Sequence, residues 1–191
     1  MDQRKIKEAV EVLARGGSVI YPTDTIYGIG VDATNEQAVK RLLELKHRDQ
    51  AKGLSVMVGN FAAIKQLTKL GPGTENLLKH KLPGPYTFIL PIMQNSAVAS
   101  KCIINGKVAV RIPNHPVALE LARAYGKPIT ATSANISGEK PLNSLESLSS
   151  LGADYILWAG PLPLAQPSTI VDLTKENAPS RILRDGAGQW P

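Results

Sequence analysis

The chain has 191 residues, of which 43% are hydrophobic, and a formal net charge of +6. This length favours a single domain over residues 1–191, and no apolar run approaches the roughly 20 residues that a membrane span needs. The charged N-terminus lacks the apolar segment of a secretory signal, and the only cysteine, Cys102, excludes an intramolecular disulfide and a multi-cysteine zinc site. We therefore expect a cytoplasmic protein that does not bind membranes and whose charge suits nucleotides or a nucleic acid.

Helix and strand patterns alternate along the chain. Ile6, Val10 and Leu13 recur at helical spacing behind Asp2, a suitable N-cap. After this helix we expect a strand at 18–21, a helix beginning at Thr34, a strand at 54–58, helices at 61–69 and 74–81, and strands at 86–90 and 108–112. The remaining elements are a helix at 115–125, a strand at 129–132, a helix near 145–151, and strands at 155–158, 169–173 and 181–183. This alternation predicts an α/β or α+β fold, with helices packed on an open sheet.

The stretch YPTDTIYGIG (21–30) contains the first motif of interest. Gly28 and Gly30, with Ala33, fit G-x-G-x-x-A, the outline of a dinucleotide-binding loop. In that loop the first glycine follows a strand directly and the third position opens a helix, whereas here PTDTIY intervenes and the next helix cap comes at Thr34 or Asn35. The spacing excludes a dinucleotide loop, and the local residues alone indicate a turn.

A cluster of cations ends the second predicted helix at Lys46, Arg48 and Lys52. Cations in a last helical turn complement the helix dipole and bond to free carbonyls. Alternatively, the helix end and loop project several cations into one place, which suits a polyphosphate. The cluster by itself leaves both interpretations open.

Two further strands carry unusual polar residues. Arg111 lies inside the apolar run VAVRIP, where it either points to solvent on an open face or meets a carboxylate, since an unpaired buried charge is costly. Ser133 and Asn135 leave another strand in TATSAN, and such residues at the end of a strand either contact a ligand or cap the loop. The chain has no Walker phosphate loop, no G-x-S-x-G elbow and no H-E-x-x-H motif, which argues against a covalent nucleophile or a catalytic zinc.

Taken in order, these stretches resemble the Sua5/YrdC/TsaC family of threonylcarbamoyl-adenylate synthases. The stretches that carry the resemblance are YPTDTIYGIG, K-x-R at Lys46 and Arg48, KGLSV (52–56), LPGPYT (82–87), VAVRIP (108–113), SAN (133–135), PSTIV (167–171) and RDG (184–186). The resemblance spans nearly the whole chain. It implies a twisted open sheet of mixed strands, with helices packed on it, around a large basic cavity.

The resemblance also implies an activity. Family members make L-threonylcarbamoyl-AMP from L-threonine, bicarbonate or CO2, and ATP, and release pyrophosphate in a nucleotidyl transfer. Another enzyme system then transfers the threonylcarbamoyl group to adenosine 37 of tRNAs that read ANN codons. Because the substrate supplies the nucleophile, the protein needs only to align reactants and neutralise charge, with Mg2+ expected to accompany ATP.

The resemblance assigns site residues position by position. ATP would contact Lys46, Arg48, Lys52, Ser133, Asn135 and Arg184. L-threonine would contact Thr25, Arg111 and Ser168. No metal ligand is implied.

The chain departs from the family pattern in places. Asp49 and Gly53 stand where many members carry proline, and Met57 stands where longer members often carry histidine. We expect the short type of member, without the linker and second domain of the longer type. A non-catalytic RNA-binding protein that uses the same basic surface is the alternative function, and weak tRNA binding is compatible with either. A carbamoyl-transfer module is a third possibility, although such proteins carry extra domains and zinc-type cysteines.

Overall fold

The structure, a computed structural model, describes residues 2–49, 53–163, 165–175 and 180–190. In these residues ten strands form one sheet. The strands are β1 (Val19–Tyr21), β2 (Gly28–Gly30), β3 (Ser55–Met57), β4 (Tyr86–Pro91), β5 (Ile103–Ile104), β6 (Lys107–Arg111), β7 (Ile129–Ser133), β8 (Tyr155–Ile156), β9 (Thr169–Asp172) and β10 (Arg181–Arg184).

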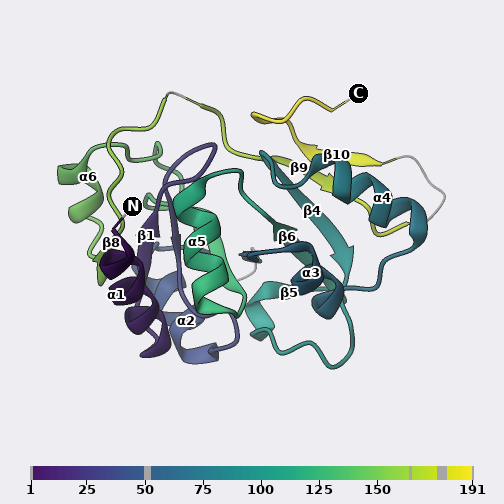
Figure 1. The fold of residues 1–191 in the computed structure, drawn as a ribbon, viewed down its shortest axis with the longest axis horizontal. Helices are drawn as coiled ribbons and strands as arrows, with labels where there is room; N and C mark the ends of the chain where they lie inside the picture. The colour runs from purple at the N-terminus through teal and green to yellow at the C-terminus, as the bar shows by residue number, and fades with distance from the viewer. Residues whose placement is uncertain (1, 50–52, 164, 176–179, 191) are drawn as a thin grey trace.

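The strand order in the sheet is β10-β9-β4-β6-β3-β7-β2-β1-β8, and β5 pairs with β6 outside this path. Three pairs are parallel, namely β1 with β8, β3 with β6 and β4 with β9, and the others are antiparallel. The predicted mixed sheet is therefore confirmed. Its strands come from all parts of the chain, so the sheet brings distant motifs together (Figure 1).

The helices are α1 (Gln3–Ala14), α2 (Glu36–Leu45), α3 (Phe61–Leu67), α4 (Pro72–Lys81), α5 (Pro116–Tyr125) and α6 (Leu145–Ser149), with a short 3-10 turn, η1, at Ser100–Cys102. Asp2 caps α1, as predicted, by accepting a hydrogen bond from the Arg4 amide at 3.0 Å. Gly126 ends α5 with φ at +74°, a left-handed conformation that glycine adopts without strain.

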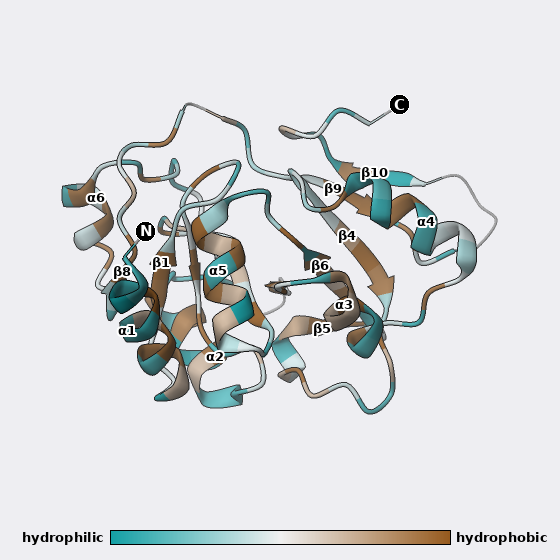
Figure 2. Ribbon diagram, in the orientation of Figure 1, coloured by the Kyte–Doolittle hydropathy of each residue, from teal (hydrophilic) through white to brown (hydrophobic). Residues whose placement is uncertain are grey.

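The two faces of the sheet are buried in two separate clusters. Alternate residues of a strand point to opposite faces, so Ile20, Val56 and Phe88 pack on one face with α2 and α3. On the other face, Val19, Tyr21, Met57 and Ile129 pack beneath α1 and α5. Figure 2 shows this pattern as hydrophobic strands beside helices that carry hydrophilic residues along their exposed sides.

Helices α1 and α5 cover only part of their face. They lie together at the β1 side of the molecule (Figure 1). Further along the same face, a cavity is lined by Ser55 of β3 and by Ala109 and Arg111 of β6. The uncovered part of this face is therefore where a site can form.

Most predicted elements are confirmed to within a few residues, with two corrections. The second helix has Asn35 as its N-cap, whose side chain accepts from the Ala38 amide, while Thr34 instead hydrogen-bonds to Asp32. The turn predicted within residues 21–30 is confirmed for residues 22–27, which link β1 to β2, but not for Gly28–Gly30, which form β2 between β1 and β7. A Cβ on Gly30 would lie 2.1 Å from the carbonyl oxygen of Thr130, so the close approach of β7 requires glycine there. Strand β2 also confirms that no dinucleotide loop is present in this stretch.

The prediction of a single domain over 1–191 stays a prediction. No helix in the described part of the chain is both long enough and apolar enough to cross a membrane.

Candidate functional site

A cavity of about 450 Å³ lies on the uncovered part of the sheet. This volume is within the range of about 300–1,000 Å³ that is typical of small-molecule sites. Its floor consists of alternate residues of neighbouring strands, among them Ser55, Ile89, Ala109 and Ala131. Ser55, Ala109 and Ala131 have small side chains, which leave room for a ligand above the sheet.

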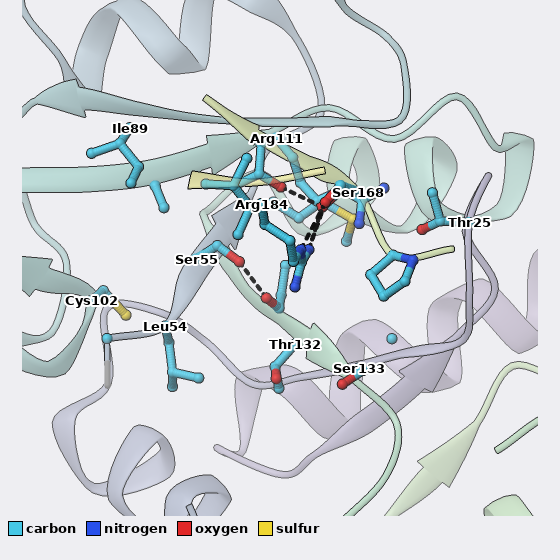
Figure 3. Close-up of a pocket in the computed structure, with 18 of the residues that line it drawn as sticks. Thr25, Leu54, Ser55, Ile89, Cys102, Arg111, Thr132, Ser133, Ser168 and Arg184 are labelled. Carbon is cyan, nitrogen blue, oxygen red and sulfur yellow. Dashed lines mark hydrogen bonds between the residues drawn. The ribbon is translucent and has the colours of Figure 1, made fainter. Parts of the chain in front are cut away.

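The cavity has chemically different ends. Figure 3 shows Leu54, Ile89 and Cys102 on one side, and Thr25 on the other, with Arg111, Arg184 and Ser168 between them. The described lining residues include four cationic side chains, Arg48, Lys107, Arg111 and Arg184, and one carboxylate, Asp172. This excess of positive charge favours an anionic ligand.

Arg111 is paired with a carboxylate of the chain itself. Its Nη2 donates to Asp24 Oδ1 at 2.8 Å, and the two side chains are only 10% and 11% exposed. Arg111 ends β6, whereas Asp24 lies in the loop between β1 and β2, so the ion pair fastens that loop to the sheet. Arg111 Nε and Asp24 Oδ2 are buried without a hydrogen-bond partner in the described residues. The charge inside VAVRIP is therefore explained by Asp24, and a substrate carboxylate would be an additional partner.

The same loop carries two buried threonines, Thr23 and Thr25, that line the cavity. Their Oγ1 atoms lie 2.9 Å apart. Thr23 Oγ1 also donates to the Ile26 carbonyl at 2.7 Å and accepts from the Thr25 amide at 3.1 Å. The hydroxyls thus cap the local turn, and both residues line the cavity. The contact between Thr25 and L-threonine stays a prediction.

Ser168 lies just before β9 and is held by its neighbours. Arg184, at the end of β10, donates from Nη2 to the Ser168 carbonyl at 2.7 Å and to Ser168 Oγ at 3.2 Å. Thr87 Oγ1 lies 2.8 Å from Ser168 Oγ. A Cβ on Gly186 would lie 2.1 Å from the Pro167 carbonyl, so the RDG stretch packs directly against the Ser168 segment. The sequence motifs PST and RDG therefore form one corner of the cavity.

Lys46 is placed differently from the other cations. It is 1% exposed and is not among the described residues that line the cavity. Its ammonium group donates to the main-chain carbonyls of Ser133 and Asn135. Burial and the nearby charge of Arg48 lower the pKa of Lys46 to about 8. Lys46 therefore holds the SAN loop (133–135) through main-chain hydrogen bonds and is not one of the described residues that line the cavity.

Asn135 likewise is not among the described residues that line the cavity. Its side-chain amide donates to the Glu139 carbonyl, and its Oδ1 accepts from the hydroxyl of Ser133. Ser133 itself lines the cavity. The SAN loop therefore presents Ser133 to the site, while Asn135 and Lys46 fix the loop.

Arg48 faces the cavity and donates to the Gly53 carbonyl at 3.0 Å. Its pKa is lowered by burial, and the pKa of Arg184 is lowered by burial and by the charges of Arg111 and Arg48. Three guanidinium groups therefore share one space, where an anion would relieve their repulsion. The predicted phosphate ligand Lys52 lies outside the described residues.

The structure thus brings six of the nine predicted site residues to one cavity: Thr25, Arg48, Arg111, Ser133, Ser168 and Arg184. The sequence reasoning missed Asp24 as the partner of Arg111, although Asp24 stands within YPTDT. It also missed Thr87, whose position in LPGPYT was its only signal. No group of three or more His, Cys, Asp or Glu that could hold a metal ion occurs in the described residues.

Comparisons with known proteins show which family the chain resembles. A model of the Sua5/YciO/YrdC family, described as "Telomere recombination", matches residues 11–186. A protein of Xanthomonas campestris named "Threonylcarbamoyl-AMP synthase" is 37% identical over 185 residues, which cover 93% of this chain and 95% of that protein. A protein of the same name from Vibrio vulnificus is 35% identical over 189 residues, covering 95% and 98%.

A solved structure extends the comparison to the fold. The structure of P. abyssi Sua5 complexed with L-threonine superposes with a TM-score of 0.87 at 33% identity. The alignment covers 97% of this chain and 55% of that longer one. The family model and the curated relatives both span most of the chain, and the chain belongs to the Sua5/YrdC family.

Proposed function

We propose that this protein is an L-threonylcarbamoyl-AMP synthase, which combines L-threonine, bicarbonate or CO2, and ATP and releases pyrophosphate. The observation that carries the proposal is the meeting of Arg48, Arg111 and Arg184 with the hydroxyls of Thr25 and Ser168 in one cavity. The cations suit a polyphosphate and a carboxylate, and the hydroxyls suit an amino acid. The names of the Xanthomonas and Vibrio relatives support the same reaction.

For ATP, we propose that Arg48, Arg184 and Ser133 contact the phosphates, because all three line the cavity. Lys46 and Asn135 contribute by fixing the SAN loop, since their polar atoms are engaged there. Lys52 remains a proposed phosphate ligand on the strength of the family resemblance alone.

For L-threonine, we propose the corner formed by Thr25, Arg111 and Ser168. Arg111 is a planar, permanently charged donor, which suits a carboxylate. Its pairing with Asp24 keeps the guanidinium fixed before the substrate arrives. The complex of P. abyssi Sua5 with L-threonine supports threonine as the ligand of such a cavity.

The chemistry then follows from positioning and charge. The threonine nitrogen uses its lone pair to form a bond to the carbon of CO2, one C=O electron pair moves to oxygen, and the nitrogen loses a proton to water. An oxygen of the resulting carbamate attacks the α-phosphorus of ATP, and pyrophosphate leaves with the electrons of the broken bond. Alignment of reactants can supply about 7–11 kcal/mol of the barrier. Guanidinium groups aimed at the phosphates stabilise the developing charge.

Mg2+ is the cofactor that we propose, carried by the ATP phosphates, because it binds mainly through substrate phosphates and water. Its role would be to neutralise phosphate charge. We also propose that the product serves a separate tRNA threonylcarbamoyl-transfer system in the cytoplasm, with at most weak contact between this chain and tRNA.

The alternative of a non-catalytic RNA-binding protein has less support. Such proteins stack bases on exposed aromatic side chains. In the described residues the exposed large hydrophobic side chains are all aliphatic, namely Met93, Ile104, Leu145, Ile182 and Leu183. Arg48, Lys107, Arg111 and Arg184 line one cavity, although Arg184 is also exposed to solvent.

The proposal is tested by incubating the pure protein with ATP, Mg2+, bicarbonate and each amino acid in turn. We expect pyrophosphate release that depends on threonine and is lost when bicarbonate is removed. Mass spectrometry of the mixture should show threonylcarbamoyl-AMP. Tight, strongly salt-dependent tRNA binding together with no ATP-dependent turnover would instead support the RNA-binding alternative.

A further inference from the structure

The segment that follows β10, residues 186–190, lies along the corner of the cavity that contains Ser168. The amide of its second residue donates to the Pro167 carbonyl at 2.9 Å. Gly188 bonds twice to the buried hydroxyl of Thr169: its amide donates to Thr169 Oγ1 at 3.0 Å, and its carbonyl accepts from that hydroxyl at 2.6 Å. The segment therefore holds the chain on both sides of Ser168.

The far end of the segment is anchored by aromatic rings. Trp190 packs edge-on against Tyr86 and Phe88 of β4, with ring centroids 6.0 and 5.8 Å away. The ammonium group of Lys81 lies 5.3 Å from the ring centroids of both Trp190 and Tyr86, which is within the range of cation–π attraction. The Tyr86 hydroxyl also donates to the Gln189 carbonyl at 2.8 Å. Strand β4 and the end of α4 thus fix the segment.

Strand β10, which precedes the segment, has little packing of its own. All four of its residues, Arg181–Arg184, are exposed, and its register with β9 shifts between Ile182 and Arg184. A strand with few buried contacts opens easily. Arg184 ends this strand and donates to the carbonyl and the hydroxyl of Ser168 (Figure 3). The restraint on Arg184 therefore comes from Ser168 and from the segment at 186–190.

We propose that Trp190 is a positioning residue of the reaction, which holds Ser168 and Arg184 at the cavity through the 186–190 segment. The inference rests on the proposed function, in which Arg184 contacts the ATP phosphates and Ser168 contacts L-threonine. Both contacts belong to one corner, so a shift of that corner misaligns the two reactants at once. Trp190 itself is not among the described residues that line the cavity, so it acts through the residues that it holds.

The first test measures amide hydrogen exchange without substrates, so it does not depend on the reaction. Trp190→Ala removes the ring contacts. We expect the two segment amides that donate to Pro167 and to Thr169 to exchange roughly tenfold faster, because aromatic contacts of this kind contribute about that factor to local stability. Unchanged exchange of both amides would overturn the inference.

Phe61→Ala is the matched control for this test. Like Trp190, Phe61 is a partly buried ring with a lysine ammonium over it, here that of Lys79 at 5.5 Å. It lies on α3 and is not among the described residues that line the cavity. Phe61→Ala should therefore leave the exchange of the two segment amides unchanged. Equal acceleration in both variants would show a general loss of stability and contradict the inference.

The second test is kinetic, at a temperature where each variant is folded. Trp190→Ala should lower kcat by roughly tenfold or more, because small misplacements of aligned groups are costly. Phe61→Ala should keep the kcat of the wild type, even where its unfolding temperature falls as far. Trp190→Phe keeps a ring in place and should restore most of the turnover. If kcat instead follows stability in all three variants, Trp190 has only a structural role and the inference is wrong.

A double-mutant cycle shows whether the effect passes through Arg184. In the background of Arg184→Gln, Trp190→Ala should reduce turnover much less than it does in the wild type, because a group that it positions is gone. Fully additive losses would contradict the proposed route.

A milder variant covers the case in which Trp190→Ala does not fold. Tyr86→Phe removes only the hydroxyl that holds the Gln189 carbonyl and keeps the ring contacts. It should accelerate exchange of the same amides and lower kcat, both by smaller factors, and no change in either would contradict the inference. If the wild type releases no threonine-dependent pyrophosphate, the proposed function fails, whereas hydrogen exchange still decides whether Trp190 holds the Ser168 corner.

Discussion

One face of the sheet contains two regions that differ in what covers them. Beneath α1 and α5 the face carries the large side chains of Val19, Tyr21 and Ile129, each 0% exposed. On the uncovered region it carries Ser55, Ala109 and Ala131, which are small, and charged residues at the margins. Both regions belong to one hydrogen-bonded sheet, so the backbone does not distinguish them.

The boundary between the two regions is narrow. Met57 packs beneath the helices, and its neighbour in register on β6 is Arg111. Met57 belongs to the hydrophobic core and also lines the cavity, and one step across the sheet leads from it to the guanidinium of Arg111. The site therefore arises where helix cover ends and side chains become small, and Asp24 supplies the negative charge that stabilises Arg111 at this margin.

Arg111→Met should disturb this margin more strongly than the other substitutions considered below. The change leaves Asp24 as a buried unpaired carboxylate, which should cost about 3–5 kcal/mol in free energy of unfolding. It should also raise the KM for threonine far more than the KM for ATP. Denaturant unfolding and steady-state kinetics measure the two effects.

The double variant Arg111→Met/Asp24→Asn separates them. Because it removes both charges, it should regain much of the stability while threonine binding stays weak. Equal increases in KM for threonine and ATP would contradict the assignment of Arg111 to the carboxylate. If the double variant is as unstable as Arg111→Met, the unpaired carboxylate of Asp24 is not the cause of the lost stability.

One substitution in each of the two regions should have opposite effects on stability and on activity. Ala118 on α5 is 0% exposed where the helix packs against the sheet. Ala118→Leu should therefore overpack the core and lower the free energy of unfolding by roughly 1–3 kcal/mol. Ala109 faces the cavity, so Ala109→Leu should cost less than about 1 kcal/mol, because open space receives the new atoms. Thermal or denaturant unfolding of both variants checks this.

Kinetics should show the opposite order. Ala109→Leu fills the centre of the cavity floor and displaces bound reactants, so we expect kcat/KM to fall by roughly 100-fold. Ala118→Leu should leave the KM values unchanged at temperatures where it is folded. If Ala109→Leu retains full turnover, the reactants do not occupy the centre of this cavity.

Much of this arrangement could be predicted from the sequence, because periodic hydrophobic residues mark strands and helices directly. Strand β2 escaped prediction since Gly28 and Gly30 carry no side chain that signals a strand. Their presence reflects the neighbouring strand, whose Thr130 carbonyl leaves no room for a Cβ at Gly30. A constraint imposed by a residue so distant in the chain has no local sequence signal.

The orientation of Lys46 and Arg48 could not be predicted for a related reason. Lys46 is the C-cap of α2 and His47 has φ at +49°, so the backbone turns sharply between the two cations. Lys46 consequently points to the SAN loop, and Arg48 points to the cavity. The family resemblance assigned both residues to ATP, and their spacing in the sequence did not reveal this change of direction.

Because Lys46 is buried, the stability of the protein should depend weakly on pH at alkaline values. With a pKa of about 8 when folded, against about 10.4 for an unperturbed lysine, Lys46 binds fewer protons in the folded than in the unfolded chain between about pH 8 and pH 10. The free energy of unfolding should therefore rise with pH in this window, by up to about 1.4 kcal/mol per pH unit. Lys46→Met removes this contribution and leaves the other titrating groups in place. The stability of the wild type, measured by denaturant unfolding, should thus gain on that of the variant as pH rises, and parallel pH curves would show that Lys46 carries its ordinary pKa behind the SAN loop.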